Sequence, residues 1–568
     1  MSEPGWGAFA GPRGFAFRPV KLQKTRSKPF VRTRFREGAI ISRALLGDAF
    51  QALELQVIEF QCDPLFAMNT QPLWKSHFDA PRYPTLDRDL KVDVVVIGGG
   101  ITGVSTAHLI ANEGLTVALV ERNRLGGGET GHTTAHVTYM TDTRLSELVR
   151  VCGQEKALLA WQAGKGAMEH VRWIANNLGE DVEWREVPGY LAAAESDDLE
   201  KEAHKLRGEC AMANRLGYDV AFLPSIAPTQ RPGLLFKGQM KFHPLKYIHA
   251  VAREAARKGA SIYEGTQVTQ FADKPKHLVA NGRKITHGHV VIATHRPLQG
   301  NSTAAGATLF QTKLASYSTY VVAARVPHDT IPEMIWSDTA DPFHYLRVDR
   351  TSEGDIIIFG GEDHKTGQEG QTVRCFEHLE NYLSRLIPAA EIINRWSGQV
   401  VKTVDGLPYI GANSEDQFIA TGFSGNGMTF GTVGAMMARD KITGRVNGWE
   451  ETFAPYRKEV TALPTYLEEN ADFPYRLVKD RMGIEDDKSS GLKKGEGCVM
   501  KINGTNAAVY RDDDGTLHQL SAVCPHLGCI VTWNEGEHTW DCPCHGSRFT
   551  ADGNVIAGPA EKPMNAIK

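Results

Sequence analysis

The chain has 568 residues, of which 42% are hydrophobic and 23% are charged, and its formal net charge is −4. This length exceeds what one hydrophobic core usually serves, so we expect two or three domains. The charge balance gives no basic footprint for nucleic acid, and no apolar run approaches the ~18 residues that a transmembrane helix needs.

Residues 1–67 differ in composition from the rest of the chain. Residues 11–36 hold nine Lys and Arg residues and no acidic residue. Three interpretations stay open: an Arg-rich transit-like presequence, a basic interaction tail, or an extension upstream of a start at Met68. Under each of them we predict a disordered basic extension. No secretory signal is evident, so a cytoplasmic protein is expected, with organellar targeting by residues 1–67 left open.

The first strong motif combines a buried strand, a glycine-rich turn, a helix and a second strand. These are residues 92–97, Gly98-x-Gly100-x-x-Gly103, 105–113 and 115–120. Glu121 follows the second strand at once. Glycines at such a turn let the backbone approach a pyrophosphate at a helix N-terminus, and an acid at this distance can bind the ribose hydroxyls. The whole pattern predicts a dinucleotide site.

Segments on both sides of the middle region distinguish FAD from NAD. They are Arg122, Gly126-Gly-Gly-Glu-Thr-Gly-His132-Thr133-Thr134, Asp405-Gly-Leu-Pro-Tyr-Ile-Gly411, and residues 418–429 with Gly425-Asn426-Gly427-Met428. This set resembles the D-amino-acid-oxidase-like FAD-dependent oxidoreductases over about residues 90–445. The resemblance implies that Arg122, Thr133 and Thr134 contact FAD and that residues 425–428 close the flavin site at its pyrimidine end. A helix N-terminus there would stabilise the negative charge of reduced flavin.

The middle of the chain predicts a substrate domain interleaved with the nucleotide domain. Residues 142–180 and 245–258 have helical periodicity, whereas 314–326, 343–349 and 355–361 read as strands of a mixed sheet. The expected fold class is therefore α/β, with a Rossmann-like FAD-binding domain and an α+β substrate domain. No second GxGxxG unit occurs between residues 130 and 400, which disfavours an NAD(P)H-dependent reductase.

Candidate substrate residues come from the same resemblance. The stretch His344-Tyr345-Leu-Arg347 resembles the strand where amino-acid oxidases of the family place a tyrosine and a carboxylate-binding arginine. The planar guanidinium fork of arginine suits a carboxylate, and the alternative for Arg347 is an ordinary ion pair. His132 lies in the flavin loop, where it could contact the ring, carry it covalently, or serve only the loop.

Two short loops near the C-terminus concentrate the metal-binding chemistry. They read Cys524-Pro-His526-Leu-Gly-Cys529 and Cys542-Pro-Cys544-His545-Gly-Ser547. Two thiolates and two imidazoles suit a [2Fe–2S] centre with histidines on one iron, and a Cys₂His₂ zinc site is the alternative. The order Cys-His…Cys-His and the extra cysteine in each loop disfavour a zinc finger. The segment resembles the Rieske ferredoxin family as far as a proline loop at Gly558-Pro559-Ala560.

The Rieske resemblance implies a role for each residue of the two loops. The cluster ligands would be Cys524 and Cys542 on the buried iron and His526 and His545 on the outer iron, with a disulfide between Cys529 and Cys544. Phe549 stands where high-potential members have a tyrosine, so we expect a lower reduction potential than in those members. The histidine edge is expected to be exposed and to release electrons to an outside acceptor.

The predicted organisation joins these parts into one enzyme. Its segments are the extension 1–67, an FAD-dependent oxidoreductase at 68–445, a linker at 446–490 and a small all-β Rieske domain at 491–568. We predict oxidation of a small amine or amino acid, with electrons passing from FAD to the cluster and on to an external acceptor. The alternatives are an oxidase that uses oxygen directly, with the Rieske domain as sensor or docking module, and a Rieske-containing NAD(P)H-dependent reductase. A Rieske oxygenase is disfavoured because no histidine follows His545.

Overall fold

The computed structural model describes residues 70–76, 78–195, 198–273, 276–297, 312–457, 462–471, 476, 479–480, 484 and 489–567. The predicted extension 1–67 lies outside the described residues. The chain divides into two compact units, Met1–Pro64 and Leu65–Lys568. The predicted oxidoreductase and Rieske parts thus belong to one unit, and the boundaries at 68–445, 446–490 and 491–568 stay predictions.

The first sheet is the predicted Rossmann-like one. Its central strand β1 (Leu90–Ile97) pairs in parallel with β2 (Val117–Val120) and β10 (Arg283–Ile292). The strand order is β16-β17-β10-β1-β2-β7, and β9 and β8 extend it from β10. The added strands are β7 (Ser261–Tyr263), β8 (Val268–Asp273), β9 (Lys276–Ala280), β16 (Tyr409–Ala412) and β17 (Gln417–Thr421). Residues 94–97 are fully buried, as expected for a parallel strand that is covered on both faces.

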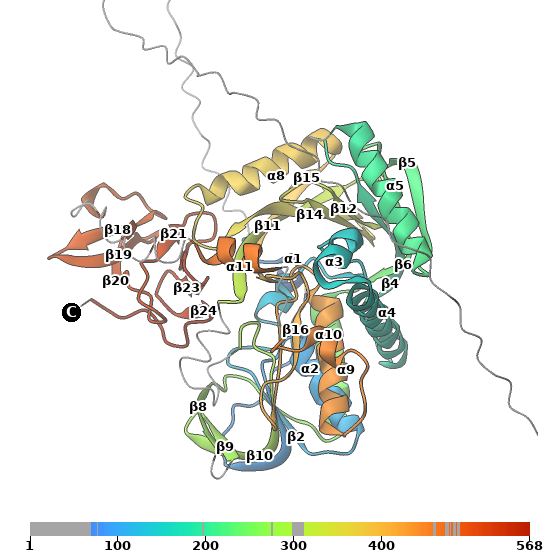
Figure 1. Cartoon of the computed structure of the whole chain (residues 1–568). Coiled ribbons are helices and arrows are strands. Elements are labelled where there is room, and N and C mark those ends of the chain that lie inside the picture. Colours follow the sequence, from blue (N-terminus) through green and yellow to red (C-terminus); the bar gives the residue numbers. More distant parts are fainter. Residues whose placement is uncertain are drawn as a thin grey trace, which may run out of the picture. The chain divides into compact units, whose positions relative to one another are not determined.

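Helix α2 (Ile101–Asn112) begins directly after the glycine turn and returns the chain to β2. It packs between α6 (Pro244–Arg257) and α9 (Gly427–Ile442), and Figure 1 shows α2 and α9 side by side against the sheet. Gly103 lets α2 lie close to the glycine turn, because a Cβ at residue 103 would lie only 1.8 Å from the carbonyl oxygen of Gly98. Gly98 itself has a φ of +108°, a conformation that favours glycine.

The second sheet has nine strands in the order β15-β11-β14-β13-β12-β4-β6-β3, with β5 beside β6. The strands are β3 (His136–Val137), β4 (Arg185–Ala192), β5 (Val220–Ile226), β6 (Arg231–Lys241), β11 (Leu314–Val326), β12 (Ile335–Asp338), β13 (Tyr345–Thr351), β14 (Gly354–Lys365) and β15 (Glu391–Thr403). Helix α8 (Thr372–Leu386) covers β11 and β14 through Phe376, Leu379 and Leu383, as Figure 1 shows. The predicted mixed sheet is therefore confirmed.

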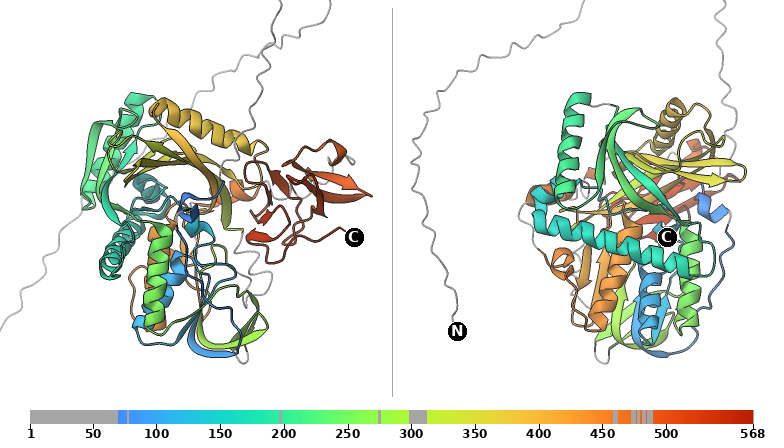
Figure 2. Two further views of the ribbon diagram at one scale, coloured as in Figure 1. Left: turned by 180° about the vertical axis from the view of Figure 1, so that it is seen from behind. Right: turned by 90° about the vertical axis from the view of Figure 1, so that its right-hand side faces the viewer.

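Further helices are α1 (Leu73–Ser76), η1 (Glu129–Gly131), α3 (Leu145–Cys152), α4 (Gln154–Asn177) and α5 (Leu199–Arg215). Helix α5 packs on β5 and β6 of the second sheet, as Figure 2 shows, whereas α4 packs on α3 and α9. In α4, Trp161, Met168 and Val171 recur at helical spacing and are buried, so the aromatic member of this stripe belongs to the core. Among the described residues, no helix combines the length and the apolar character that crossing a membrane requires.

The C-terminal part is all-β, as predicted. Short helices α10 (Glu450–Phe453), α11 (Leu463–Asn470) and η3 (Ser489–Gly491) precede it. One sheet holds β18 (Gly497–Ile502), β19 (Thr505–Arg511) and β20 (Leu517–Ser521), and the other holds β21 (Thr532–Asn534), β22 (Thr539–Asp541), β23 (Arg548–Thr550) and β24 (Val555–Ala557). Trp540, Phe549 and Val531 fill the core of this part. The two cysteine–histidine loops precede β21 and connect β22 to β23.

Candidate functional site

A cavity of about 680 Å³ opens at the carboxyl ends of β1, β2 and β10. Ligands of parallel α/β sheets bind at this edge. Nearly all the predicted FAD residues line the cavity, together with His132 and Tyr345: Gly98, Gly100, Glu121, Arg122, Thr133, Thr134, Gly425, Asn426, Gly427 and Met428. Gly103 does not line it and instead brings α2 close to the glycine turn. The fold therefore assembles residues that lie more than 300 positions apart in the sequence.

Backbone donors converge at the glycine turn. Gly100 is the N-cap of α2 and offers no side chain. Ile101 N–H donates to Thr130 Oγ1 at 3.1 Å, and this N-terminus of α2 lines the cavity, as an anion site requires. Glu121 accepts hydrogen bonds from the N–H groups of Gly99 and Asn123, each at 2.7 Å. Burial raises the pKa of this carboxyl group, and the two backbone bonds oppose the rise. The turn and the acid are thus held in one arrangement.

The opposite end of the cavity is built around the N-terminus of α9. Asp142 accepts a hydrogen bond of 2.6 Å from the N–H of Gly425, and Asn426 donates from Nδ2 to the carbonyl oxygen of Met140 at 3.0 Å. These bonds tie residues 140–142, which follow β3, to the start of α9. The positive end of the helix dipole at Gly427 therefore points into the cavity lining.

His132 is fixed by three contacts. Its Nδ1 lies 2.9 Å from the carbonyl oxygen of Gly128, so Nδ1 carries the proton, and its carbonyl oxygen accepts from Trp396 Nε1 at 2.8 Å. Its Nε2 lies 3.4 Å from Lys75 Nζ. Burial and the neighbouring Lys75 lower the pKa of His132 to about 3. The imidazole is consequently neutral, with Nε2 as an acceptor.

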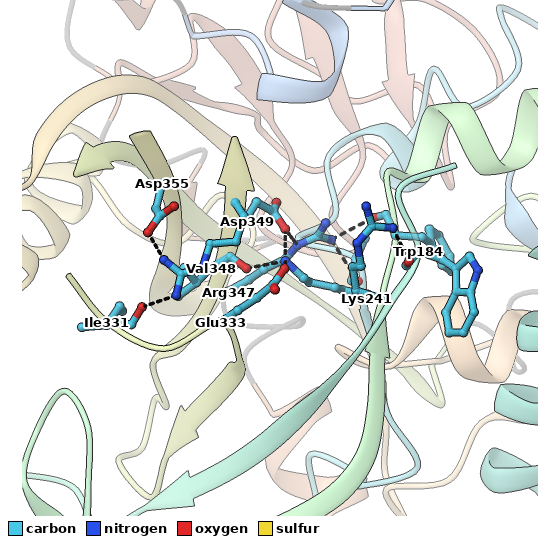
Figure 3. Close-up of polar contacts among 12 residues, drawn as sticks. Trp184, Lys241, Ile331, Glu333, Arg347, Val348, Asp349 and Asp355 are labelled. Atoms are coloured by element: carbon cyan, nitrogen blue, oxygen red, sulfur yellow. Dashed lines mark hydrogen bonds and ion pairs between the residues drawn. The ribbon is translucent and has the colours of Figure 1, made fainter. Parts of the chain in front are cut away.

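Arg347 does not line the cavity. Its Nη1 donates to three backbone carbonyls, those of Thr134, Ala135 and Phe242 at 2.9–3.2 Å, and its Nε donates to Asp349 at 2.9 Å. Figure 3 shows this guanidinium beside Lys241 and Asp349. Only 1% of Arg347 is exposed. The expected carboxylate clamp is therefore not supported, because the chain's own acceptors occupy the guanidinium.

Tyr345 remains a cavity residue, and its hydroxyl lies 2.7 Å from Thr319 Oγ1. Sequence reasoning missed four further acids that line the cavity, Asp142, Glu209, Asp338 and Asp363. After burial, Asp363 and Asp142 are the groups that raise the pKa of Tyr345, so these two lie near it. Asp363 Oδ1 is buried and has no hydrogen-bond partner. Burial raises the pKa of Asp363, with Lys402 Nζ, 3.7 Å away, opposing the rise. The sequence feature that could have indicated Asp363 is its position near the polar C-terminal end of the otherwise apolar strand β14.

The two cysteine–histidine loops share one backbone design. In the first loop, Cys524 N–H donates to Cys529 O at 2.8 Å and Gly528 N–H donates to Cys524 O at 3.0 Å. In the second loop, Cys542 N–H donates to Ser547 O at 2.8 Å and Gly546 N–H donates to Cys542 O at 2.9 Å. The glycine at the fifth place of each loop has a φ of +78° or +75°. Two matching turns of this kind present their side chains to one shared space.

The predicted cluster ligands meet between these turns. The His526 and His545 rings have centroids 5.1 Å apart, and Cys524 and Cys542 belong to the same buried group. Cys529 and Cys544 form the predicted disulfide, and its sulfurs lie within 4.8 Å of Cys542 Sγ. The proline loop is tied in as well, because Ala560 N–H donates to Ser547 Oγ at 3.0 Å.

The C-terminal part contacts the rest of the unit through residues 532–561. Hydrogen bonds of 2.7–3.4 Å join them at Arg122–Ile556, Gln267–Glu561, Gln368–Pro543, Gln399–Gly546, Thr532–Gly367, Asn534–Tyr320, Gly536–Thr372 and Arg548–Ser397. Residues 554–561 also line the 680 Å³ cavity. One cavity is thus shared by the two parts of the chain.

The histidine edge is covered more than predicted, although both rings are half-buried as a whole. Both ring nitrogens of His526 are buried, and His545 borders a small cavity together with Ser316 and Lys402. Burial, and after it Arg296, lower the pKa of His526 to about 4. The histidine edge therefore lies against the oxidoreductase strands, and on the first loop it is Leu527, 38% exposed, that meets solvent.

Comparison with known proteins agrees with this architecture. The family model described as DAO, FAD dependent oxidoreductase, matches residues 93–440, more than half of the chain. The chain belongs to this family. A second family model, Rieske [2Fe-2S] domain, matches residues 484–568. The protein is accordingly an FAD-dependent oxidoreductase with a C-terminal Rieske domain, and its cofactors are FAD and a [2Fe–2S] cluster.

Three relatives illustrate the match. YhfW of Bacillus subtilis (strain 168), named a Rieske 2Fe-2S iron-sulfur protein, is 34% identical over 503 residues, covering 87% of this chain and 97% of YhfW. A cytochrome b6-f complex iron-sulfur subunit of Synechococcus sp. (strain JA-3-3Ab) is 49% identical over 57 residues, 10% of this chain and 33% of the subunit. The glycine oxidase structure from Geobacillus kaustophilus has a TM-score of 0.55 at 19% identity, covering 65% of this chain and 99% of that chain, which shows the fold.

The residues present fit both cofactors. The N-terminus of α2, where Gly100 has no side chain to cap the helix, and the close-packed Gly98 together form a backbone site that fits a pyrophosphate. In the Rieske domain, the unpartnered and buried ring nitrogens of His526 are the donor atoms that an iron would take. Cys524 and Cys542 are free thiols, unlike the bonded Cys529 and Cys544. The donor set at this place is therefore two thiols and two imidazoles.

Proposed function

We propose that the protein oxidises a small amine and passes the electrons through its own Rieske domain to an external acceptor. FAD supplies a hydride acceptor and the cluster supplies a one-electron acceptor when bound. The observation that carries the proposal is the packing of the loop Cys542–Ser547 on strands that also line the FAD cavity. Gln399 makes this contact directly, since it lines the cavity and donates to Gly546 O at 2.7 Å.

We assign the cofactor-binding roles as follows. The backbone of the glycine turn would hold the pyrophosphate, Glu121 would take the ribose hydroxyls, and the start of α9 would face the flavin pyrimidine. Arg122, Thr133 and Thr134 would contact FAD from the loop that follows β2. The cluster ligands would be Cys524, His526, Cys542 and His545. The FAD residues line one cavity, and the cluster ligands lie between the two matching turns. These shared locations support the assignments.

The charges of the cavity favour an amine over an amino acid. Four acids, Asp142, Glu209, Asp338 and Asp363, line it. Arg144, which also lines it, is paired with Glu202 at 2.8 Å. Because Arg347 donates to backbone carbonyls, it is poorly placed to bind a substrate carboxylate, whereas the four acids would attract an ammonium group.

Asp363 is the residue best suited to the substrate's nitrogen. An ammonium group must lose a proton before its neighbouring carbon can give up a hydride, and the carbon–nitrogen bond then becomes an imine that water hydrolyses. A carboxylate with an unpartnered oxygen can bind the ammonium group, and a pKa raised by burial makes it a better proton acceptor. Tyr345 and Thr319 would close this side of the site.

The test is anaerobic reduction of the holoprotein with matched pairs of amines and their α-carboxylated amino acids, followed by flavin absorbance. We expect an amine to bleach the flavin, and Asp363→Asn to raise the KM for that amine by about tenfold or more, because a charged hydrogen bond is lost. Asp219→Asn, at a residue whose side chain is 74% exposed, is the control and should change nothing. Equal KM values in Asp363→Asn and wild type would refute this role.

The same experiment separates the alternatives. Reduction by amino acids but not by amines would contradict the substrate class. Rapid reoxidation by oxygen with an oxidised cluster throughout would favour the oxidase in which the Rieske domain is a sensor or docking module. Reduction by NAD(P)H alone would favour the reductase.

A further inference from the structure

The FAD domain holds the second cluster loop on two sides. Gly367, just after β14, approaches the loop so closely that a Cβ there would lie 2.9 Å from the nitrogen of Pro543. On the other side, a Cβ at Gly546 would lie 2.3 Å from Ser316 Cβ. The loop that carries Cys542 and His545 therefore has fixed neighbours on β11 and after β14.

Arg296 holds Ser316, the residue that contacts Gly546, by hydrogen bonds. It follows β10 and lines the FAD cavity, yet only 2% of it is exposed. Its Nε and Nη2 donate to Ser316 Oγ at 2.9 and 2.6 Å, and Nη2 also donates to the carbonyl oxygen of Leu314 at 3.1 Å. Its Nη1 is buried and has no hydrogen-bond partner. A single side chain thus links the cavity to the residue that touches Gly546.

Arg296 has no carboxylate partner in the described part of the chain. Its hydrogen bonds go to Ser316 and Leu314, and Nη1 has no partner among these residues. It lies close to the predicted ligands, because Ser316, to which it donates, touches Gly546 and lines the small cavity that His545 also borders. At neutral pH the guanidinium is therefore a buried cation beside the cluster site.

We propose that Arg296 raises the reduction potential of the Rieske cluster from the FAD side of the interface. One-electron reduction of the cluster converts one ferric iron to ferrous iron and adds one negative charge, with no bond made or broken. A buried cation stabilises that added charge far more than an exposed cation does. Placed between the cavity and the cluster, the same cation favours movement of an electron from reduced flavin to iron. The inference rests on the proposed ligand residues but not on the substrate.

The test is a mediated anaerobic titration of full-length holoprotein with dithionite, with the reduced cluster followed by EPR. Arg296→Gln keeps a polar side chain and removes the charge. We expect its one-electron reduction equilibrium to weaken at least tenfold, which is 59 mV for a one-electron couple. Arg296→Lys keeps the charge and should stay closer to wild type. Arg283→Gln, at an exposed position on β10, is the control and should show the wild-type potential.

An unchanged potential in Arg296→Gln would overturn the proposal. If that variant fails to hold a cluster, Arg296→Met replaces it, because methionine also removes the charge and keeps an unbranched side chain; an unchanged potential in Arg296→Met would then overturn the proposal. Absence of a reduced Rieske signal in the wild-type protein would refute the ligand assignment. That outcome differs from an unchanged potential in the Arg296 variants, which would refute only the role of Arg296. Dithionite makes every result independent of the amine proposal.

Discussion

At the scale of single residues, Arg347 shows how a motif residue is used by the fold. The sequence places it beside Tyr345, where a substrate arginine was expected. Its hydrogen-bond acceptors come from residues 134, 135 and 242, more than 100 positions away, so no local pattern could reveal them. Within the chain, Arg347 on β13 is bonded to Thr134, Ala135 and Phe242, which follows β6.

We predict that Arg347→Met destabilises the protein rather than weakening substrate binding. Removing the guanidinium leaves Asp349 with Lys241 as its remaining partner and takes a donor from three carbonyls, which costs about 3–5 kcal/mol and lowers Tm. Arg172→Met, which removes a surface ion pair with Glu186, is the control and should cost about 0–1 kcal/mol. Wild-type stability together with a strongly raised KM in Arg347→Met would restore the carboxylate clamp.

Glu537 gives the interface a pH dependence. Burial raises its pKa to about 7, against an ordinary value of 4.5, with Arg548 opposing the rise. The folded state thus binds the proton more tightly than the unfolded chain, and this contribution to stability is lost as pH rises from about 4.5 through 7. We predict that wild-type stability falls over this window by on the order of 2 kcal/mol from this group.

Calorimetry at several pH values between 4.5 and 8 tests this prediction. Glu537→Gln imitates the protonated form, so its Tm should decline less than that of wild type over the window. Glu535→Gln, two residues away and exposed, should follow the wild-type curve. Parallel curves for Glu537→Gln and wild type would show that this carboxyl group is ionised in the folded protein.

At the scale of elements, the motifs located most of the site. The strand–glycine–helix pattern at 92–122 and the two cysteine–histidine loops depend on local geometry, since their glycines, caps and ligands act within a few residues. These parts were therefore predictable. The acids that line the cavity were not, because Asp142, Asp338 and Asp363 come from separate segments that only the nine-stranded sheet and the flavin loop bring together.

The turn after β14 offers a test of how one element supports another. Gly367 has a φ of +75° and lies against Cys542 and Pro543, so Gly367→Ala should push on the second cluster loop. We expect an altered EPR line shape of the reduced cluster and a loss of cluster content. Gly370→Ala is matched to it, because nothing lies within 4 Å of a Cβ at that glycine. Identical spectra for both variants would contradict a fixed loop.

At the scale of the whole molecule, the Rieske domain is built against the oxidoreductase. Eight hydrogen bonds cross between them, and residues 554–561 help to line the FAD cavity. The sequence showed that both domains exist but not which edge of the cluster faces the flavin. That orientation depends on contacts between residues more than 100 positions apart, and it covers both ring nitrogens of His526, which we expected to face solvent.

The account as a whole rests on one electron path within one chain. The most direct measurement is rapid-freeze EPR of the anaerobic holoprotein, taken after a substrate amine has bleached the flavin. The account predicts that the reduced Rieske signal grows as the substrate's electrons enter the flavin, before any external acceptor is added. A fully reduced flavin beside a cluster that stays oxidised would contradict it.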